Sequence, residues 1–175
     1  MGLADAYLLP QSQANVGKKH QLDIGSGTGY YLRRGGLPAA TQLTLVGLER
    51  PALEIGLHRS GRAGDARGIV ADILQPFLVE DDTKFDSISV YYLLHCISAN
   101  VKAKFVHGAN VLGKGVRRDN LFAKHIRRMV LRDGIFHNED DNAYDFEHAL
   151  RQNFEEVETA AVGSVFMFRA ARPKY

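Results

Sequence analysis

The chain has little of several features that would direct it to particular classes of protein. A single cysteine, Cys96, excludes an internal disulfide and argues against a zinc cluster. The 22 basic and 20 acidic residues leave a net charge of +2, which predicts neither strong nucleic-acid binding nor a polybasic membrane surface. No apolar run approaches the length of a membrane span, and the N-terminus lacks signal-peptide architecture. We therefore expect a soluble, cytoplasmic protein that needs no metal, membrane or nucleic acid.

The first half of the chain alternates short apolar runs with helical stretches. Apolar runs bounded by turn residues predict buried strands over residues 21–24, 43–48, 68–72 and 85–92. A short helix is expected from Tyr30, and another over residues 51–59, where Pro51 suits a first helical turn. Residues 1–19 lack clear periodicity, and the polar run 11–15 within them is interpreted as loop or a weak helix end. This alternation predicts an α/β, Rossmann-like doubly wound fold with a mostly parallel sheet.

The second half ends in a different pattern. Apolar residues at helical spacing predict a helix over residues 119–132, and another from Asn138 with Phe146, Leu150 and Phe154 on its apolar face. Two strands over 157–162 and 165–169 are separated only by Gly163-Ser164, which indicates an antiparallel β-hairpin. At 175 residues, with 45% of them hydrophobic, the chain is expected to form one domain over 1–175.

A glycine loop follows the first predicted strand, in the run Asp23 to Gly29. Strand, glycine turn and helix form the nucleotide-binding opening of doubly wound folds, because the glycines admit a ligand to the backbone and the helix N-terminus carries partial positive charge. The spacing Gly25-x-Gly27-x-Gly29 differs from the dinucleotide fingerprint, and it resembles motif I of class I S-adenosylmethionine-dependent methyltransferases. That resemblance implies that Gly25, Ser26, Gly27 and Gly29 hold the aminocarboxypropyl part of S-adenosylmethionine, with Asp23 near its ammonium group. The alternative is a glycine turn in an ordinary protein.

Two acidic residues follow further strands in the order that this family has. Glu49, 20 residues after Gly29, is expected to meet the ribose hydroxyls. A second alignment would place Gly47 at that position, and a solvated Glu49 before a helix is the other interpretation. The resemblance implies that Asp72 accepts a hydrogen bond from the adenine amino group while Ile73 packs on the ring.

The run from Phe85 to Cys96 resembles motif IV of the same family, whose residues border cofactor and substrate. Tyr91 is therefore expected at the cofactor. Methyl transfer from a sulfonium is an in-line displacement, and a general base is needed only for a neutral hydroxyl or a protonated amine. His95 is the candidate base and Tyr92 a positioning group. The alternative for His95 is a packed, hydrogen-bonded histidine.

The resemblance covers roughly His20 to Arg172 and divides the domain into a short N-terminal segment, a cofactor-binding half and a substrate half, over residues 1–19, 20–97 and 98–175. Later runs over 112–116, 134–138 and 162–168 resemble small-molecule methyltransferases, whose microbial and fungal members are often associated with secondary metabolism. This implies S-adenosyl-L-methionine as cofactor and a small-molecule acceptor, and a homodimer is one expectation for the assembly.

The chain departs from the family pattern in two places. Only about 20 residues precede the first strand, where related domains carry a helix or two. The connection after the fourth strand leaves about ten to fourteen residues for a crossover that needs a dozen or more. The fifth strand then lies near 105–111 or 108–112, or residues 101–112 form one helix and the strand is absent. Two further hypotheses are therefore a degenerate, non-catalytic binding module and, against the glycine spacing, an NAD(P)-dependent oxidoreductase.

Overall fold

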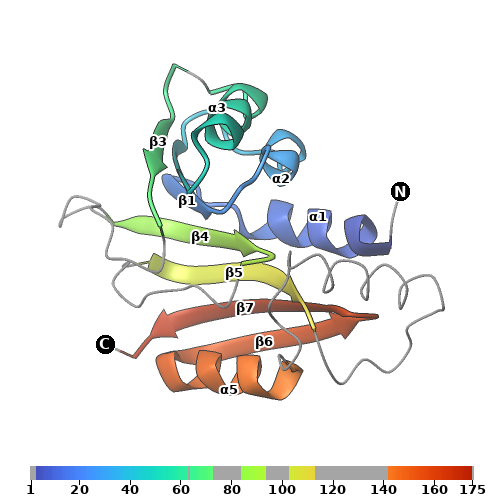
Figure 1. Cartoon of the computed structure of the whole chain (residues 1–175). Helices are drawn as coiled ribbons and strands as arrows, with labels where there is room; N and C mark the ends of the chain where they lie inside the picture. Colours follow the sequence, from blue (N-terminus) through green and yellow to red (C-terminus); the bar gives the residue numbers. More distant parts are fainter. Residues whose placement is uncertain (1–2, 63, 73–83, 94–102, 113–141, 175) are drawn as a thin grey trace.

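A twisted sheet of seven strands forms the centre of the computed structural model, which describes residues 3–62, 64–72, 84–93, 103–112 and 142–174 (Figure 1). The strand order is β3-β2-β1-β4-β5-β7-β6, and only β7 runs antiparallel to its neighbours. This confirms the predicted fold class. The strands are β1 His20–Ile24, β2 Gln42–Gly47, β3 Arg67–Val70, β4 Phe85–Tyr91, β5 Ala103–Val111, β6 Phe154–Val162 and β7 Val165–Pro173.

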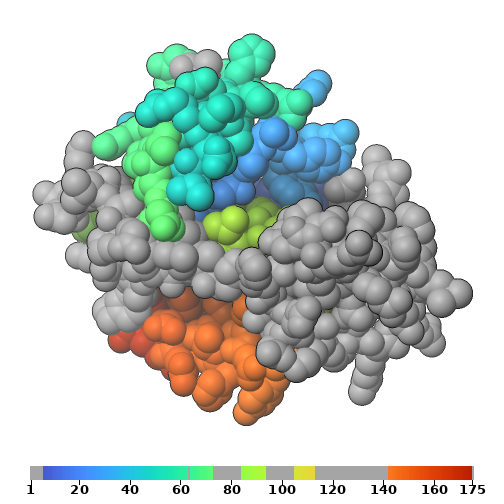
Figure 2. Space-filling view, in the orientation of Figure 1, coloured from blue at the N-terminus to red at the C-terminus, as the bar shows by residue number. Residues whose placement is uncertain are grey.

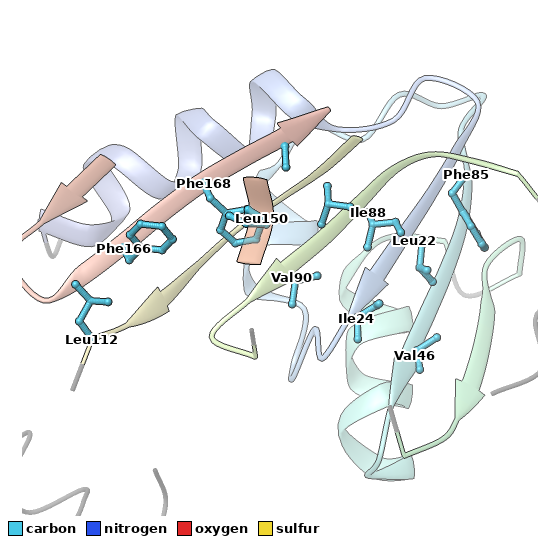
Figure 3. Packing of buried hydrophobic residues seen from close by; sticks show 12 residues of the cluster. Leu22, Ile24, Val46, Phe85, Ile88, Val90, Leu112, Leu150, Phe166 and Phe168 are labelled. Carbon is cyan, nitrogen blue, oxygen red and sulfur yellow. The ribbon is translucent and has the colours of Figure 1, made fainter. Parts of the chain in front are cut away.

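Helices cover both faces of this sheet. One face packs against α5 (Ala143–Asn153) through an apolar cluster that runs across the strands from Val46 in β2 to Phe166 in β7 (Figure 3). The other face packs against α1 (Leu3–Asn15), α2 (Tyr30–Arg34) and α3 (Arg50–Arg59) through two smaller apolar clusters. No helix among the described residues is both long and apolar enough to cross a membrane.

The fifth strand exists and lies beside the fourth. β5 pairs in parallel with β4 from Phe85↔Ala103 to Tyr91↔Ala109, and its other edge pairs with β7. The alternative of a helix over 101–112 is therefore wrong, because the backbone of this segment finds its hydrogen-bond partners on both sides in the sheet. The crossover itself, residues 94–102, and the predicted helix over 119–132 lie outside the described residues.

The N-terminal segment also differs from what its sequence predicts. It forms the helix α1 over Leu3–Asn15, although its sequence shows no helical apolar stripe. Polar side chains hold this helix on the sheet: Gln11 Nε2 donates to the carbonyl oxygen of Phe168 at 2.8 Å, and Ser87 Oγ donates to that of Asn15 at 2.8 Å. Leu8 is fully buried beside them. Because these contacts come from distant strands, periodicity within the segment does not reveal the helix.

The C-terminal hairpin has the predicted turn. Val162 pairs with Val165 across Gly163-Ser164, and Gly163 has a φ of 60°. The preceding helix, α5, is N-capped by Asn142, whose Oδ1 accepts from the amide of Asp145 at 3.0 Å. Asn138, where this helix was expected to begin, lies outside the described residues. Phe154 opens β6 instead of continuing the helix.

Candidate functional site

A cavity of about 440 Å³ opens at the carboxyl ends of β1 and β4. It lies where parallel α/β sheets bind ligands, because the strand order reverses direction between these two strands. In Figure 2, atoms coloured blue for the first third of the chain meet the yellow-green atoms of the β4 region on the surface between α3 and α5. The lining residues are Asp23, Gly25, Ser26, Gly27, Tyr30, Tyr31, Leu32, Tyr91, Tyr92 and Leu93.

The three loop glycines share a left-handed backbone but have different surroundings. Their φ angles are 69°, 52° and 74° at Gly25, Gly27 and Gly29, which disfavour any side chain. A Cβ on Gly27 would meet no atom within 4 Å, so this residue leaves open space beside the cavity. A Cβ on Gly29 would lie 2.9 Å from Gly56 Cα in α3. Gly29 therefore lets α2 approach α3 and does not line the cavity itself.

Asp23 supplies a buried carboxylate at the cavity wall. Its side chain is on β1, 5% exposed, and its Oδ2 accepts from Ser89 Oγ at 2.7 Å. Burial raises the pKa of Asp23 to about 6, against which the hydrogen bond from Ser89 acts. The carboxylate is thus ionised near neutral pH and costly to hold without a cation beside it.

Tyrosines from α2 and β4 form the opposite wall. The Tyr31 ring stacks on Tyr91, with centroids 4.5 Å apart. Tyr92 has a φ of 62°, unusual for a bulky residue, and its amide donates to the carbonyl oxygen of Ala109 at 2.5 Å. Tyr92 therefore holds a strained backbone conformation at the cavity wall.

The other predicted cofactor residues lie near the same sheet edge without lining the cavity. Glu49 is exposed and stands at the N-cap of α3, two residues beyond the end of β2. Asp72 is exposed and follows β3 by two residues. Ile73 and His95 lie outside the described residues. The structure therefore brings together Asp23, the first part of the glycine loop, Tyr91 at the end of β4 and Tyr92 directly after it.

The sequence analysis missed the polar residues behind Asp23. Gln21, Ser89 and His107 are all buried, and they come from β1, β4 and β5. The available signal was the alternation within runs such as Gln21-Leu22-Asp23-Ile24, since strands buried on both faces are normally apolar throughout. Polar residues at every second position indicate one face that carries a site.

The fold is that of S-adenosylmethionine-dependent methyltransferases. The structure is similar to the crystal structure of the N-methyltransferase NodS from Bradyrhizobium japonicum WM9 in complex with S-adenosyl-L-homocysteine, with a TM-score of 0.62 over 95% of this chain and 84% of that one. Sequence identity is 16%, so this likeness shows the fold alone. No family model matches the sequence.

Curated relatives show the family. The chain is 66% identical to the N-methyltransferase vrtF of Penicillium aethiopicum, over 96% of this chain and 75% of the relative. It is 54% identical to the O-methyltransferase adaD of Aspergillus niger, over 95% of this chain and 76% of that relative. The chain therefore belongs to the class I methyltransferase family, whose cofactor is S-adenosylmethionine. These relatives favour neither the oxidoreductase nor the non-catalytic module.

The alignment with the first of these relatives extends over 183 residues, which exceeds the 175 of this chain. The relative therefore holds internal positions that have no counterpart here. The shortening between the fourth and fifth strands stays a prediction, since those positions are not located.

Proposed function

We propose that this methyltransferase binds S-adenosylmethionine in the 440 Å³ cavity and transfers its methyl group to a small-molecule acceptor. The observation that carries the proposal is the pairing of the buried Asp23 carboxylate with an open left-handed glycine, Gly27, at one cavity wall. The carboxylate can pair with the ammonium group of the cofactor, and the glycine lets the aminocarboxypropyl part of the cofactor pass close to the backbone. The relatives' names include both an N- and an O-methyltransferase, so they support methyl transfer without fixing the acceptor atom.

The residues present suit the cofactor. Gly25, Ser26 and Gly27 line the cavity and offer backbone to the aminocarboxypropyl part, while Asp23 faces its ammonium. Tyr31 and Tyr91 present aromatic surface, which favours a sulfonium cation. Glu49 is proposed for the ribose hydroxyls and Asp72, with Ile73, for the adenine, because both acids follow strands that end at the same edge.

Bound S-adenosylmethionine supplies a methyl group already activated by its sulfonium. The chain's task is to hold the acceptor's lone pair about 3 Å from that carbon and in line with the sulfur. The new bond forms as the carbon–sulfur bond breaks, and that electron pair stays on sulfur. Tyr92 is proposed to position the acceptor, and His95 to take the proton that a hydroxyl or protonated amine must lose.

Self-association is a separate proposal. β6 is the outermost strand of the described sheet, and its acidic side chains already pair with β7, as in Arg172–Glu156 at 2.8 Å. We propose a homodimer in the cytoplasm that uses this edge, because an open strand edge invites pairing. Light scattering at several protein concentrations tests it, and a mass of one chain throughout would contradict it.

Calorimetric titration tests the function. S-adenosylmethionine and S-adenosylhomocysteine should bind the wild-type chain, and NAD should give no heat. Gly27→Val should weaken binding at least ~100-fold, because its side chain would strain the loop and enter the cavity. Gly61→Val is the matched control, since Gly61 also has a positive φ, 73°, and open space but lies outside the cavity.

The control separates two outcomes. Loss of binding in Gly27→Val alone supports the site, whereas equal loss in both variants would trace the effect to general instability. If the wild-type chain gave no binding heat with either S-adenosylmethionine or S-adenosylhomocysteine, the proposed function would be overturned.

A further inference from the structure

A second, much smaller cavity lies behind Asp23, between α1 and the strands β1, β4 and β5. Its volume is about 10 Å³, which is roughly the space that one water molecule requires. Asp23, Tyr31 and Leu32 line both this inner cavity and the cofactor cavity, so they lie between the two. The other polar residues around the inner cavity are Ser12, Gln21, Ser89 and His107.

His107 lines the inner cavity and carries an unsatisfied polar atom. Its side chain is 1% exposed, and its Nε2 has no hydrogen-bond partner among the described residues. Its Nδ1 lies 3.2 Å from the Tyr91 hydroxyl. Burial, reinforced by the nearby charge of Arg169, lowers the pKa of His107 to about 3, so the ring is neutral and carries one N–H.

The Tyr91 hydroxyl contacts Nδ1 of His107 and also hydrogen-bonds to the Ser12 side chain. We assign this hydroxyl as the donor to Nδ1, which places the proton of the neutral ring on Nε2.

We propose that the inner cavity binds one ordered water, which accepts from Nε2–H of His107 and donates to the Asp23 carboxylate. His107 is then a positioning residue for the cofactor site, acting through water and Asp23. This role rests on the proposed function, in which Asp23 faces the cofactor's ammonium. A buried donor left unpaired is costly, and a bridging water is the small polar ligand that fits this space.

A second series of donors reaches Asp23 through Ser89, which lies between Asp23 and His107 in the strand register. The amide of Gly17 donates to Gln21 Oε1 at 2.7 Å, which fixes the orientation of that side chain. Gln21 Nε2 donates to Ser89 Oγ at 3.0 Å, and Ser89 donates to Asp23. The carboxylate therefore stands where two donor series meet, one based on α1 and β5 and the other on β1 and β4. Both stabilise its charged form before any ligand arrives.

The test measures the titration of Asp23 in the ligand-free chain by carbon NMR of its carboxyl group. The titratable groups that line the two cavities with Asp23 are Tyr30, Tyr31, Tyr91, Tyr92 and His107, and the charge of Arg169 acts on His107. His107→Leu removes the donor and should raise the pKa of Asp23 by about one unit, because a hydrogen bond to the charged form is lost. His107→Gln keeps an N–H donor and should restore most of the wild-type pKa.

Asn110→Leu provides the matched control. Asn110 lies on the same strand, is equally buried at 2% exposed, and also has an unpartnered side-chain nitrogen, but it belongs to the opposite face of the sheet. It should leave the pKa of Asp23 unchanged. An equal shift in Asn110→Leu and His107→Leu, or no shift in either, would overturn the proposal.

A high-resolution crystal structure of the wild-type chain gives an independent readout that needs no variant. Electron density for a water between His107 and Asp23 is expected, and a cavity without it would overturn the proposal. The proposed function fails separately, when calorimetry shows no binding of S-adenosylmethionine while the titration of Asp23 still responds to His107.

Discussion

Asp23 is the residue at which folding and function conflict most clearly. Its carboxyl group is buried, and its pKa is raised from 3.8 to about 6 by desolvation. The fold therefore favours the neutral acid, whereas the proposed partner, an ammonium group, requires the carboxylate. A carboxyl group whose pKa is higher in the folded than in the unfolded chain stabilises the fold fully below its pKa in the unfolded chain, near 4. That contribution is lost as the pH rises through 6.

Replacement of Asp23 by Asn should raise the stability of the fold and abolish cofactor binding. Asp23→Asn keeps the size of the side chain and removes the buried charge, so we expect the free energy of unfolding at pH 7 to rise by up to ~3 kcal/mol. The same variant should lose S-adenosylmethionine binding. Urea unfolding of both chains at pH 4 and pH 7 measures the effect, because the difference between the variants at the two pH values isolates Asp23 from the other carboxylates.

Cofactor affinity should follow the same titration. Binding should be constant above about pH 6.5 and fall up to tenfold per pH unit below 6, since the proton competes with the ammonium for Asp23. Calorimetry across this range checks it. An affinity that stays flat down to pH 5, or an Asp23→Asn variant that binds normally, would remove Asp23 from the site.

At the scale of elements, the pairing of β5 with β4 holds the two halves of the sheet together. Gly108 lies opposite Val90 in this pairing, and a Cβ on Gly108 would overlap the carbonyl oxygen of Val90. Gly108→Ala should therefore cost about 3 kcal/mol or more of unfolding free energy, because the overlap is with backbone and cannot be relieved by a side-chain rotation.

Gly64→Ala is the control for this change. A Cβ on Gly64 would meet nothing within 4 Å, so its unfolding free energy should stay within about 0.5 kcal/mol of the wild type. Urea or thermal unfolding compares the two variants. If Gly108→Ala is as stable as Gly64→Ala, then β5 does not lie against β4 as described.

The sequence predicts most of the elements because their signals are local. The strands of the first half are short apolar runs, and the terminal hairpin has its glycine at the turn. Local signals did not predict the helix α1 and left β5 open between a strand and a helix, since both elements depend on distant partners. Hydrogen bonds to Phe168 and Ser87 hold α1, and β5 contains Gly108, Asn110 and His107, which weaken an apolar strand pattern.

The residues of the candidate site were likewise predictable only where their signal is local in the sequence. Asp23 and the glycine loop could be predicted to lie together at one sheet edge, because they are consecutive in sequence and follow a strand. Ser89 and His107 could not be assigned to the site, because they lie on β4 and β5 and come near Asp23 only when the sheet forms. A buried polar face is visible in sequence, but its hydrogen bonds depend on strand order.

At the scale of the whole molecule, a cavity at the carboxyl edge of the sheet links ligand binding to global stability. Asp23, Tyr31 and Tyr91 line it and belong to β1, α2 and β4, so a bound ligand adds contacts to three elements at once. S-adenosylmethionine at 100 times its dissociation constant should add about 2.7 kcal/mol. The thermal midpoint should rise by roughly 5–10 °C. Equal shifts with NAD would contradict the family assignment of the site.

The central claim is that the cofactor of this methyltransferase lies against the loop after β1. An NMR titration with S-adenosylhomocysteine, which follows the backbone amide signals, tests it most directly. Shifts should concentrate at the cavity-lining residues within 23–32 and 91–93 and leave the hairpin of β6 and β7 nearly unchanged. Saturable shifts centred on the hairpin, with the signals of Gly25 and Gly27 unmoved, would contradict it.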